Sequence, residues 1–224
     1  MSVCSICHGG CCRRYYVDFT GYDLYNISKH LELEIPFFAE TVEVKDEDVT
    51  ELSKDAALFK FTDNNCKNFV RFCLRRINST VMPSSTRCLF LLEWDGEFLG
   101  LKEHNTVLGR CGIYQLRPLT CAIYPVRIDE KNGLIGCVSD PYEICEKKNN
   151  PAYNVCPRPL IKEDFADYTG EISKFLALHK YEMAFFKALA DDWNEDPGSL
   201  SEFLERLVKI YSNRIQFKPY KKTE

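Results

Sequence analysis

The stretch Cys4-Ser5-Ile6-Cys7-His8-Gly9-Gly10-Cys11-Cys12-Arg13 brings four cysteines into nine positions and ends them in an adjacent pair. Neighbouring cysteines do not form an unstrained disulfide with each other, because adjacent residues reach the required Cα separation only with backbone distortion. Thiolates two to four residues apart are instead suited to converge on one metal ion or cluster. The glycine pair allows the positive φ angles of a tight turn. The stretch therefore predicts half of a thiolate metal site.

The middle of the chain supplies a second group of cysteines beside restricted backbone. Cys111 and Cys121 flank the dipeptide Arg117-Pro118, and Pro125 follows shortly after. Proline fixes its own φ and biases the preceding residue toward extended geometry, so the segment predicts a corner between the two cysteines. We expect the opening loop to close onto this corner and the two groups of sulfurs to meet at one inorganic centre.

Length and composition are those of a globular protein with one domain and an appendage, or with two small domains. The 224 residues are 45% hydrophobic and include twelve cysteines, a share below the roughly 8–10% that marks small disulfide scaffolds. No basic and apolar secretory signal precedes Cys4, so we expect a cytoplasmic location. In a reducing compartment, clustered cysteines are more often metal ligands or redox groups than disulfides.

Several function classes are disfavoured. The net charge of −4 argues against binding to nucleic acid or to an anionic membrane surface, and no apolar run approaches the about 20 residues of a spanning helix. We find no dinucleotide fingerprint, phosphate-binding loop or hydrolytic triad. The expected partner is a protein or redox partner whose identity the sequence does not reveal.

The first part of the chain predicts short elements. Residues 13–19 are aromatic and β-branched, which favours an extended segment. A capping box that starts at Thr20 predicts a helix over about 21–31. The acidic segment 40–55 is compatible with a helix or with a loose insertion, and residues from about 58 to 129 read as short strands and loops.

The last part of the chain predicts a helical hairpin. The first helix begins near Glu163 or Thr169 and ends at about Asp192, and a second follows the capping box of Ser199 and Glu202. The expected fold class is α+β, with a small irregular cysteine-rich core of short strands followed by this hairpin. The expected domains are residues 1–157, with an insertion around 40–85, and residues 158–224.

Taken together, these motifs resemble the YkgJ-type cysteine cluster family, whose members are described as zinc- or iron-chelating proteins and are sometimes labelled Fe–S oxidoreductases. The resemblance covers roughly residues 4 to 137. It rests on Cys11-Cys12-Arg13, Thr20 with Asp23, Cys88-Leu89-Phe90-Leu91, Cys111-Gly112-Ile113-Tyr114, Arg117-Pro118 and Cys121-Ala122-Ile123-Tyr124-Pro125. A more distant similarity links the pattern to flagellin lysine methylases, whose cysteine-rich region is thought to hold an iron–sulfur cluster.

The resemblance implies eight metal ligands, although three residues rather than two separate Cys7 from Cys11 and no Pro-Gly follows Cys137. These implied ligands are Cys4, Cys7, Cys11, Cys12, Cys88, Cys111, Cys121 and Cys137. All-thiolate ligation suits both zinc and iron–sulfur clusters, and we favour the cluster.

Three function classes stay open from the sequence. The first is a non-catalytic module in which zinc is structural or is carried, and the second is an enzyme whose iron–sulfur cluster serves electron transfer or group transfer, as in an oxidoreductase or a methyltransferase-like protein. The third is a thiol redox sensor. Electron transfer predicts a reducible chromophore, whereas structural zinc predicts none.

The other candidate residues have structural alternatives. His8 is a possible ligand or a turn residue, His179 suits a helix core, and Cys73 suits a buried hydrophobic position. Cys66, Cys145 and Cys156 match no ligand spacing. Three arginines lie near the cysteines in the chain, and they are Arg13, Arg14 and Arg117. We expect them either to offset thiolate charge or to form surface ion pairs.

Overall fold

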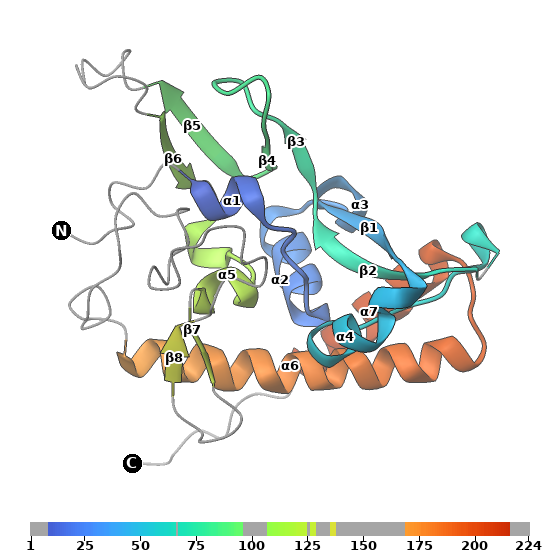
Figure 1. Cartoon of the computed structure of the whole chain (residues 1–224). Helices are drawn as coiled ribbons and strands as arrows, with labels where there is room; N and C mark the ends of the chain where they lie inside the picture. The colour runs from blue at the N-terminus through green and yellow to red at the C-terminus, as the bar shows by residue number, and fades with distance from the viewer. Residues whose placement is uncertain are drawn as a thin grey trace, which may run out of the picture. The chain divides into compact units, whose positions relative to one another are not determined.

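The protein is mixed α+β, as the sequence predicts, with short two-stranded sheets in its N-terminal part and two C-terminal helices (Figure 1). The computed structural model describes residues 9–65, 67–95, 107–124, 126–128, 135–137 and 169–215. The chain divides into two compact units, and each unit combines two separate stretches. The first unit is Met1–Val17 with Leu74–Leu178, and the second is Asp18–Cys73 with His179–Glu224. The expected boundary between residues 157 and 158 lies outside the described residues.

The first unit is built from short antiparallel hairpins and small helices. Its hairpins are β3 (Arg76–Asn78) with β4 (Thr86–Cys88), β5 (Leu91–Asp95) with β6 (Val107–Cys111), and β7 (Val126–Ile128) with β8 (Ile135–Cys137). Its helical turns are α1 (Gly10–Arg14), η5 (Tyr114–Leu116) and α5 (Leu119–Ile123).

Helix α1 corrects the expected extended segment at residues 13–19. Arg13 and Arg14 are helical, and the extended backbone begins at Tyr15. A tertiary contact stabilises this helical turn: the guanidinium of Arg76 donates hydrogen bonds to the carbonyl oxygens of Arg13 and Tyr15. These carbonyls lie at the C-terminal end of α1, where a helix leaves acceptors without partners of its own. The corner at Arg117 is extended as predicted, with φ −57° and ψ 145°.

The second unit packs the C-terminal helices against the segment between residues 18 and 73. Helix α6 (Thr169–Glu195) starts in the first unit and continues into the second, where α7 (Leu200–Ile215) follows it. The remaining elements are α2 (Gly21–Leu31), α3 (Ile35–Phe38), β1 (Ala39–Val44), η2 (Asp46–Asp48), α4 (Val49–Asp55), η3 (Thr62–Asn64) and β2 (Phe69–Leu74). Segment 40–55 therefore consists mostly of the strand β1 and the helix α4. Strand β1 pairs with β2.

An aromatic cluster joins these two stretches within the second unit. The ring of Phe59 lies 5.3 Å from that of Phe72, 5.0 Å from that of Phe186 and 4.6 Å from that of Phe203, measured between centroids. All four side chains are buried. Contacts of this kind add to the free energy of burying apolar surface. The cluster therefore provides the core on which α6 and α7 pack.

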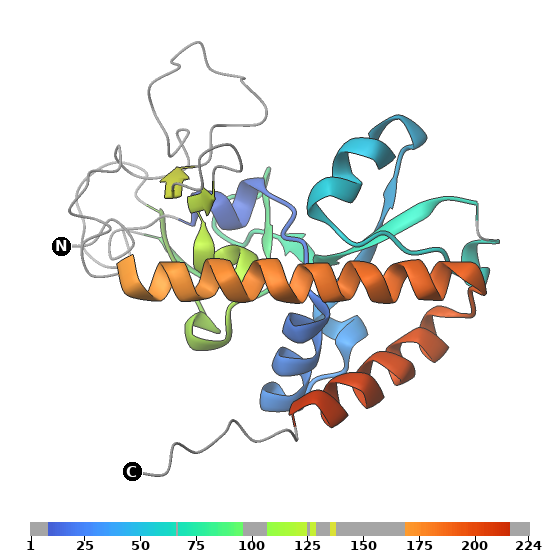
Figure 2. The same ribbon diagram turned by 90° about the horizontal axis from the view of Figure 1, so that it is seen from below.

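The predicted helical hairpin is confirmed. Arg214 near the end of α7 forms an ion pair with Glu182 of α6, and Trp193 near the end of α6 packs on Phe203 near the start of α7. The two helices therefore run antiparallel, and Figure 2 shows α7 next to α2. Within the described residues, neither helix is long and apolar enough to cross a membrane.

Candidate metal centre

The candidate ligands of the first unit come from four different elements. Cys11 and Cys12 lie on α1, Cys88 ends β4, Cys111 ends β6, and Cys121 lies on α5. None of these five cysteines forms a disulfide; Cys88 is buried and the other four are half-buried. Figure 1 shows α1 beside β4, and the two elements are in contact. The structure therefore places the adjacent cysteine pair against the strand that carries Cys88.

The sulfurs of Cys11 and Cys12 are 4.0 Å apart. A disulfide would need about 2.05 Å. Two thiolates on one tetrahedral ion lie about 3.8 Å apart, because each metal–sulfur bond is about 2.3 Å long. The spacing of the pair is therefore close to that of two ligands of one ion.

Cys12 occupies a central place among the thiols. Burial is the main cause that raises the pKa of Cys88 to about 12, and charge on Cys12 and Cys111 raises it further. Burial also raises the pKa of Cys111, and charge on Cys12 adds to that effect. Because like charges disfavour each other at short range, these shifts indicate that Cys12 lies within electrostatic range of both other thiols. The three thiols come from three separate elements, α1, β4 and β6.

The pKa of Cys12 is lowered, whereas the pKa values of Cys88 and Cys111 are raised. The hydrogen bond with Cys11 lowers its pKa most, and the charges of Arg13 and Arg76 lower it further, while burial opposes them. A thiolate is the form that binds metal and acts as a nucleophile. The local charges therefore favour the ligand form of Cys12.

Backbone amides are directed at two of the sulfurs. The amide of Phe90 donates a hydrogen bond to Sγ of Cys88 at 3.3 Å, and the amide of Ile113 donates to the thiol of Cys111. Each donor lies two residues after its cysteine in the chain. Hydrogen bonds to sulfur stabilise negative charge on a ligand and tune the metal that it holds.

Gly9, directly before α1, lies close to β5. Its φ is +73°, and a Cβ built on it would lie 2.8 Å from Cδ1 of Leu91. Leu91 is paired with Cys111 across β5 and β6. A larger residue at position 9 would be strained and would also collide with the side chain of Leu91.

A family model described as a "putative zinc- or iron-chelating domain" with the cysteine pattern CxxCxxCC matches residues 3–146. The chain belongs to this family. The comparisons with curated proteins and with solved structures found no match. The family match covers all eight candidate ligands, and a set of thiol ligands suits both metals that the description names.

Part of the expected ligand set lies outside the described residues. Cys4, Cys7 and His8 precede them, and the structure describes the backbone of Cys137 in β8 but not its side chain. Cys66, Cys145 and Cys156, for which no role was predicted, also lie outside. Among the residues that the structure does describe, no three candidate ligands are close enough to hold an ion by themselves. The role of each cysteine as a ligand stays a prediction.

Two residues with predicted structural roles lie in the second unit. Cys73 is fully buried, as expected, and its thiol donates a hydrogen bond to a carboxylate oxygen of Asp18 at 3.4 Å. Burial raises its pKa, so it is a protonated thiol. His179 is half-buried rather than a core residue, and burial lowers its pKa.

The arginines near the cysteines differ in their surroundings. Arg14 is exposed, while the guanidinium of Arg117 lies 3.9 Å from the ring centroid of Tyr114 and lowers the pKa of Cys111. Arg13 instead forms an ion pair with Glu93, whose side chain is 1% exposed. Sequence reasoning did not single out Glu93 or Arg76, because neither lies next to a cysteine in the chain.

Proposed function

We propose that the protein holds an iron–sulfur cluster through its clustered cysteines and uses it in electron transfer or group transfer. The observation that carries the proposal is the packing of α1, which holds the adjacent cysteines, against β4, which ends at Cys88. Charge on Cys12 also raises the pKa of both Cys88 and Cys111. The described residues would supply Cys11, Cys12, Cys88, Cys111 and Cys121, and the opening loop would supply Cys4 and Cys7. A bound cluster would supply a one-electron redox centre.

The number of thiols suits either metal. Eight candidate cysteines exceed the four ligands of a single tetrahedral zinc and also the four of one iron–sulfur cluster, so they allow two sites or one site with spare thiols. The surroundings also suit an anionic centre, since the amide of Phe90 donates to sulfur and the cations Arg13 and Arg76 lie near Cys12. These residues would stabilise the reduced, more negative state of the centre. The half-buried thiols Cys11 and Cys111 leave the region open to a partner.

A zinc site is the second candidate, and the pair Cys11 and Cys12 favours it. Their sulfur separation of 4.0 Å is close to the about 3.8 Å between two ligands of one zinc ion. In that case the protein would be a non-catalytic module in which zinc is structural or is carried to a partner. The cytoplasmic location expected from the sequence suits either candidate, because thiols stay reduced there.

Anaerobic purification followed by metal, sulfide and absorption analysis tests the proposal. Iron with acid-labile sulfide and a visible band that bleaches on reduction would support the cluster. Stoichiometric zinc without colour would select the zinc module. A protein that binds neither metal, after reconstitution with iron and sulfide or with zinc, would contradict both.

A further inference from the structure

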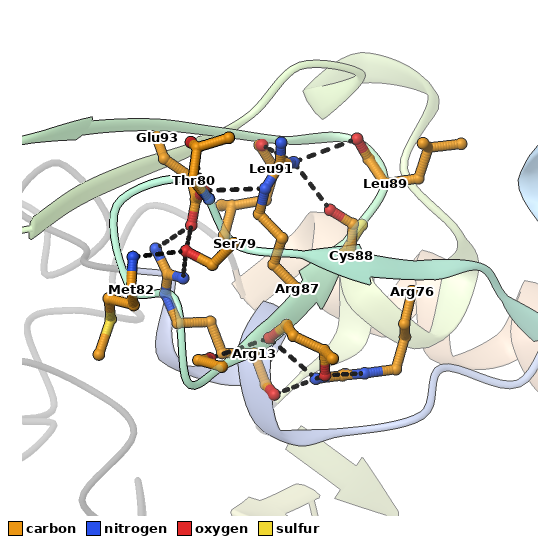
Figure 3. A network of polar contacts seen from close by, with 12 residues as sticks. Arg13, Arg76, Ser79, Thr80, Met82, Arg87, Cys88, Leu89, Leu91 and Glu93 are labelled. Atoms are coloured by element: carbon orange, nitrogen blue, oxygen red, sulfur yellow. Dashed lines mark hydrogen bonds and ion pairs between the residues drawn. The ribbon is translucent and has the colours of Figure 1, made fainter.

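Glu93 is a buried carboxylate at the centre of a polar network in the first unit (Figure 3). Nε of Arg87 lies 2.8 Å from one carboxylate oxygen, and Arg13 pairs with the other. Ser79 Oγ donates to Glu93 at 2.8 Å, and the amide of Thr80 donates at 3.1 Å. Removing a carboxylate from water is costly unless charges and hydrogen bonds replace the water. This network meets that requirement with two guanidinium groups.

One of these guanidinium groups belongs to the helix of the adjacent cysteines. Arg13 follows Cys12 directly on α1, and its Nη1 also donates to Ser79 Oγ at 3.0 Å. Glu93 lies on β5, where it is paired with Gly109 of β6. The carboxylate therefore ties α1 to the β5–β6 hairpin that carries Cys111.

The other guanidinium group belongs to the strand that ends at Cys88. Nη1 of Arg87 donates to the carbonyl oxygens of Cys88 at 3.3 Å, of Leu89 at 3.4 Å and of Leu91. These carbonyls extend from the end of β4 at Cys88 to the start of β5 at Leu91, and in the turn between them the amide of Phe90 donates to the sulfur of Cys88. Leu91 in turn is paired with Cys111. Glu93 therefore anchors, through Arg87, the backbone around two further candidate ligands.

We infer that Glu93 is a positioning residue for the metal centre, because its carboxylate holds Arg13 and Arg87 and so holds the backbone of Cys12, Cys88 and Cys111 in register. The inference rests on the proposed thiolate centre, whichever metal fills it. Glu93 does not touch the metal and acts through the two arginines.

A purely structural role is the alternative, and the second unit offers a matched comparison. Glu182 is also buried, forms an ion pair with Arg214 at 3.0 Å and accepts a hydrogen bond from Tyr211 at 3.2 Å. It lies in the unit that holds none of the predicted ligands among its described residues. If buried ion pairs mattered only for folding, Glu93→Gln and Glu182→Gln would have the same consequences.

The test compares Glu93→Gln, Glu182→Gln and the unaltered full-length chain. The probe is cobalt(II), with affinity measured by competition against a chromophoric chelator and thiolate ligation followed by the sulfur-to-metal absorption band. Thermal unfolding of each metal-free protein is recorded in parallel. We expect Glu93→Gln to weaken cobalt binding by about 10–100-fold, the usual effect of losing a group that orients metal ligands. Glu182→Gln should lower the midpoint of unfolding and leave cobalt affinity within about twofold.

A second variant separates position from charge. Arg13→Lys keeps the positive charge beside Cys12 but loses the planar fork that pairs with Glu93 and Ser79. We expect cobalt affinity to fall in this variant as well. If Glu93→Gln does not fold, the cobalt affinity of Arg13→Lys tests the positioning role of Glu93 instead. Unchanged affinity in the folded variants would overturn the inference while leaving the metal site intact. Absence of cobalt binding by the unaltered chain would instead contradict the proposed centre.

Discussion

At the scale of single residues, the thiols differ in what surrounds them, and this predicts which substitutions affect metal binding. We expect Cys12→Ser, Cys88→Ser and Cys111→Ser each to lower metal content strongly, because the charges of these thiols influence one another. Cys73→Ser is the matched control, since that buried thiol bonds to Asp18 in the other unit. Metal analysis after identical reconstitution measures the difference. Equal retention of metal in all four variants would contradict the assignment.

The buried thiols also predict a pH dependence of metal binding. Cys88, with its pKa raised to about 12 by burial first and then by its thiol neighbours, is protonated at neutral pH, and the pKa of Cys111 is raised as well. Metal must displace these protons, so affinity should rise with pH and fall in acid. We expect about a tenfold change per pH unit for each proton displaced, measured by zinc competition between about pH 6 and about pH 8. A pH-independent affinity would show that the thiols are already ionised without metal.

At the scale of elements, two capping boxes with the same chemistry sit in different surroundings. In the box of α2, Thr20 Oγ1 accepts from the amide of Asp23 at 3.2 Å and Asp23 accepts from the amide of Thr20 at 2.9 Å, with both residues buried. In the box of α7, Ser199 and Glu202 exchange the same bonds in an exposed position. Both helix starts are confirmed, because a capping box is a local pattern that needs no tertiary information.

The two boxes predict unequal losses of stability. Thr20→Ala should cost about 1–2 kcal/mol, because it also removes a partner of the buried Asp23 carboxylate, whereas Ser199→Ala should cost about 0.5 kcal/mol. Urea unfolding monitored by circular dichroism measures both free energies. Equal costs would show that burial does not strengthen the α2 cap. Neither change should alter metal content, since both caps lie in the second unit.

At the scale of the whole molecule, each compact unit is assembled from stretches that are distant in the chain. The second unit joins Asp18–Cys73 to the C-terminal helices through Phe59, Phe72, Phe186 and Phe203. The C-terminal hairpin is therefore part of the core of that unit. The sequence indicated the hairpin but not its partner, because an apolar helix face does not specify which surface covers it.

This arrangement predicts a large effect at one face of α7 and a small one at another. Phe203→Ala should destabilise the second unit by about 3–5 kcal/mol, because it opens a cavity among the aromatic rings. Val208 of the same helix is 40% exposed, and Val208→Ala should change stability by no more than about 0.5 kcal/mol. Urea unfolding of both variants provides the comparison. Similar losses would contradict the observed packing of α7.

The sequence by itself determined the family, the cysteine-rich motifs, the start of α2, the corner at Arg117 and the two C-terminal helices. Each of these features depends on spacing over a few residues. A capping side chain bonds to nearby backbone, and apolar residues repeat along one face of a helix. Only the tertiary structure decided that Arg13 and Arg14 are helical, and that Glu93 pairs with Arg13, which follows Cys12, and with Arg87, which precedes Cys88. The reason is that burial of a carboxylate between two guanidinium groups depends on which strands become neighbours, and local spacing does not encode that.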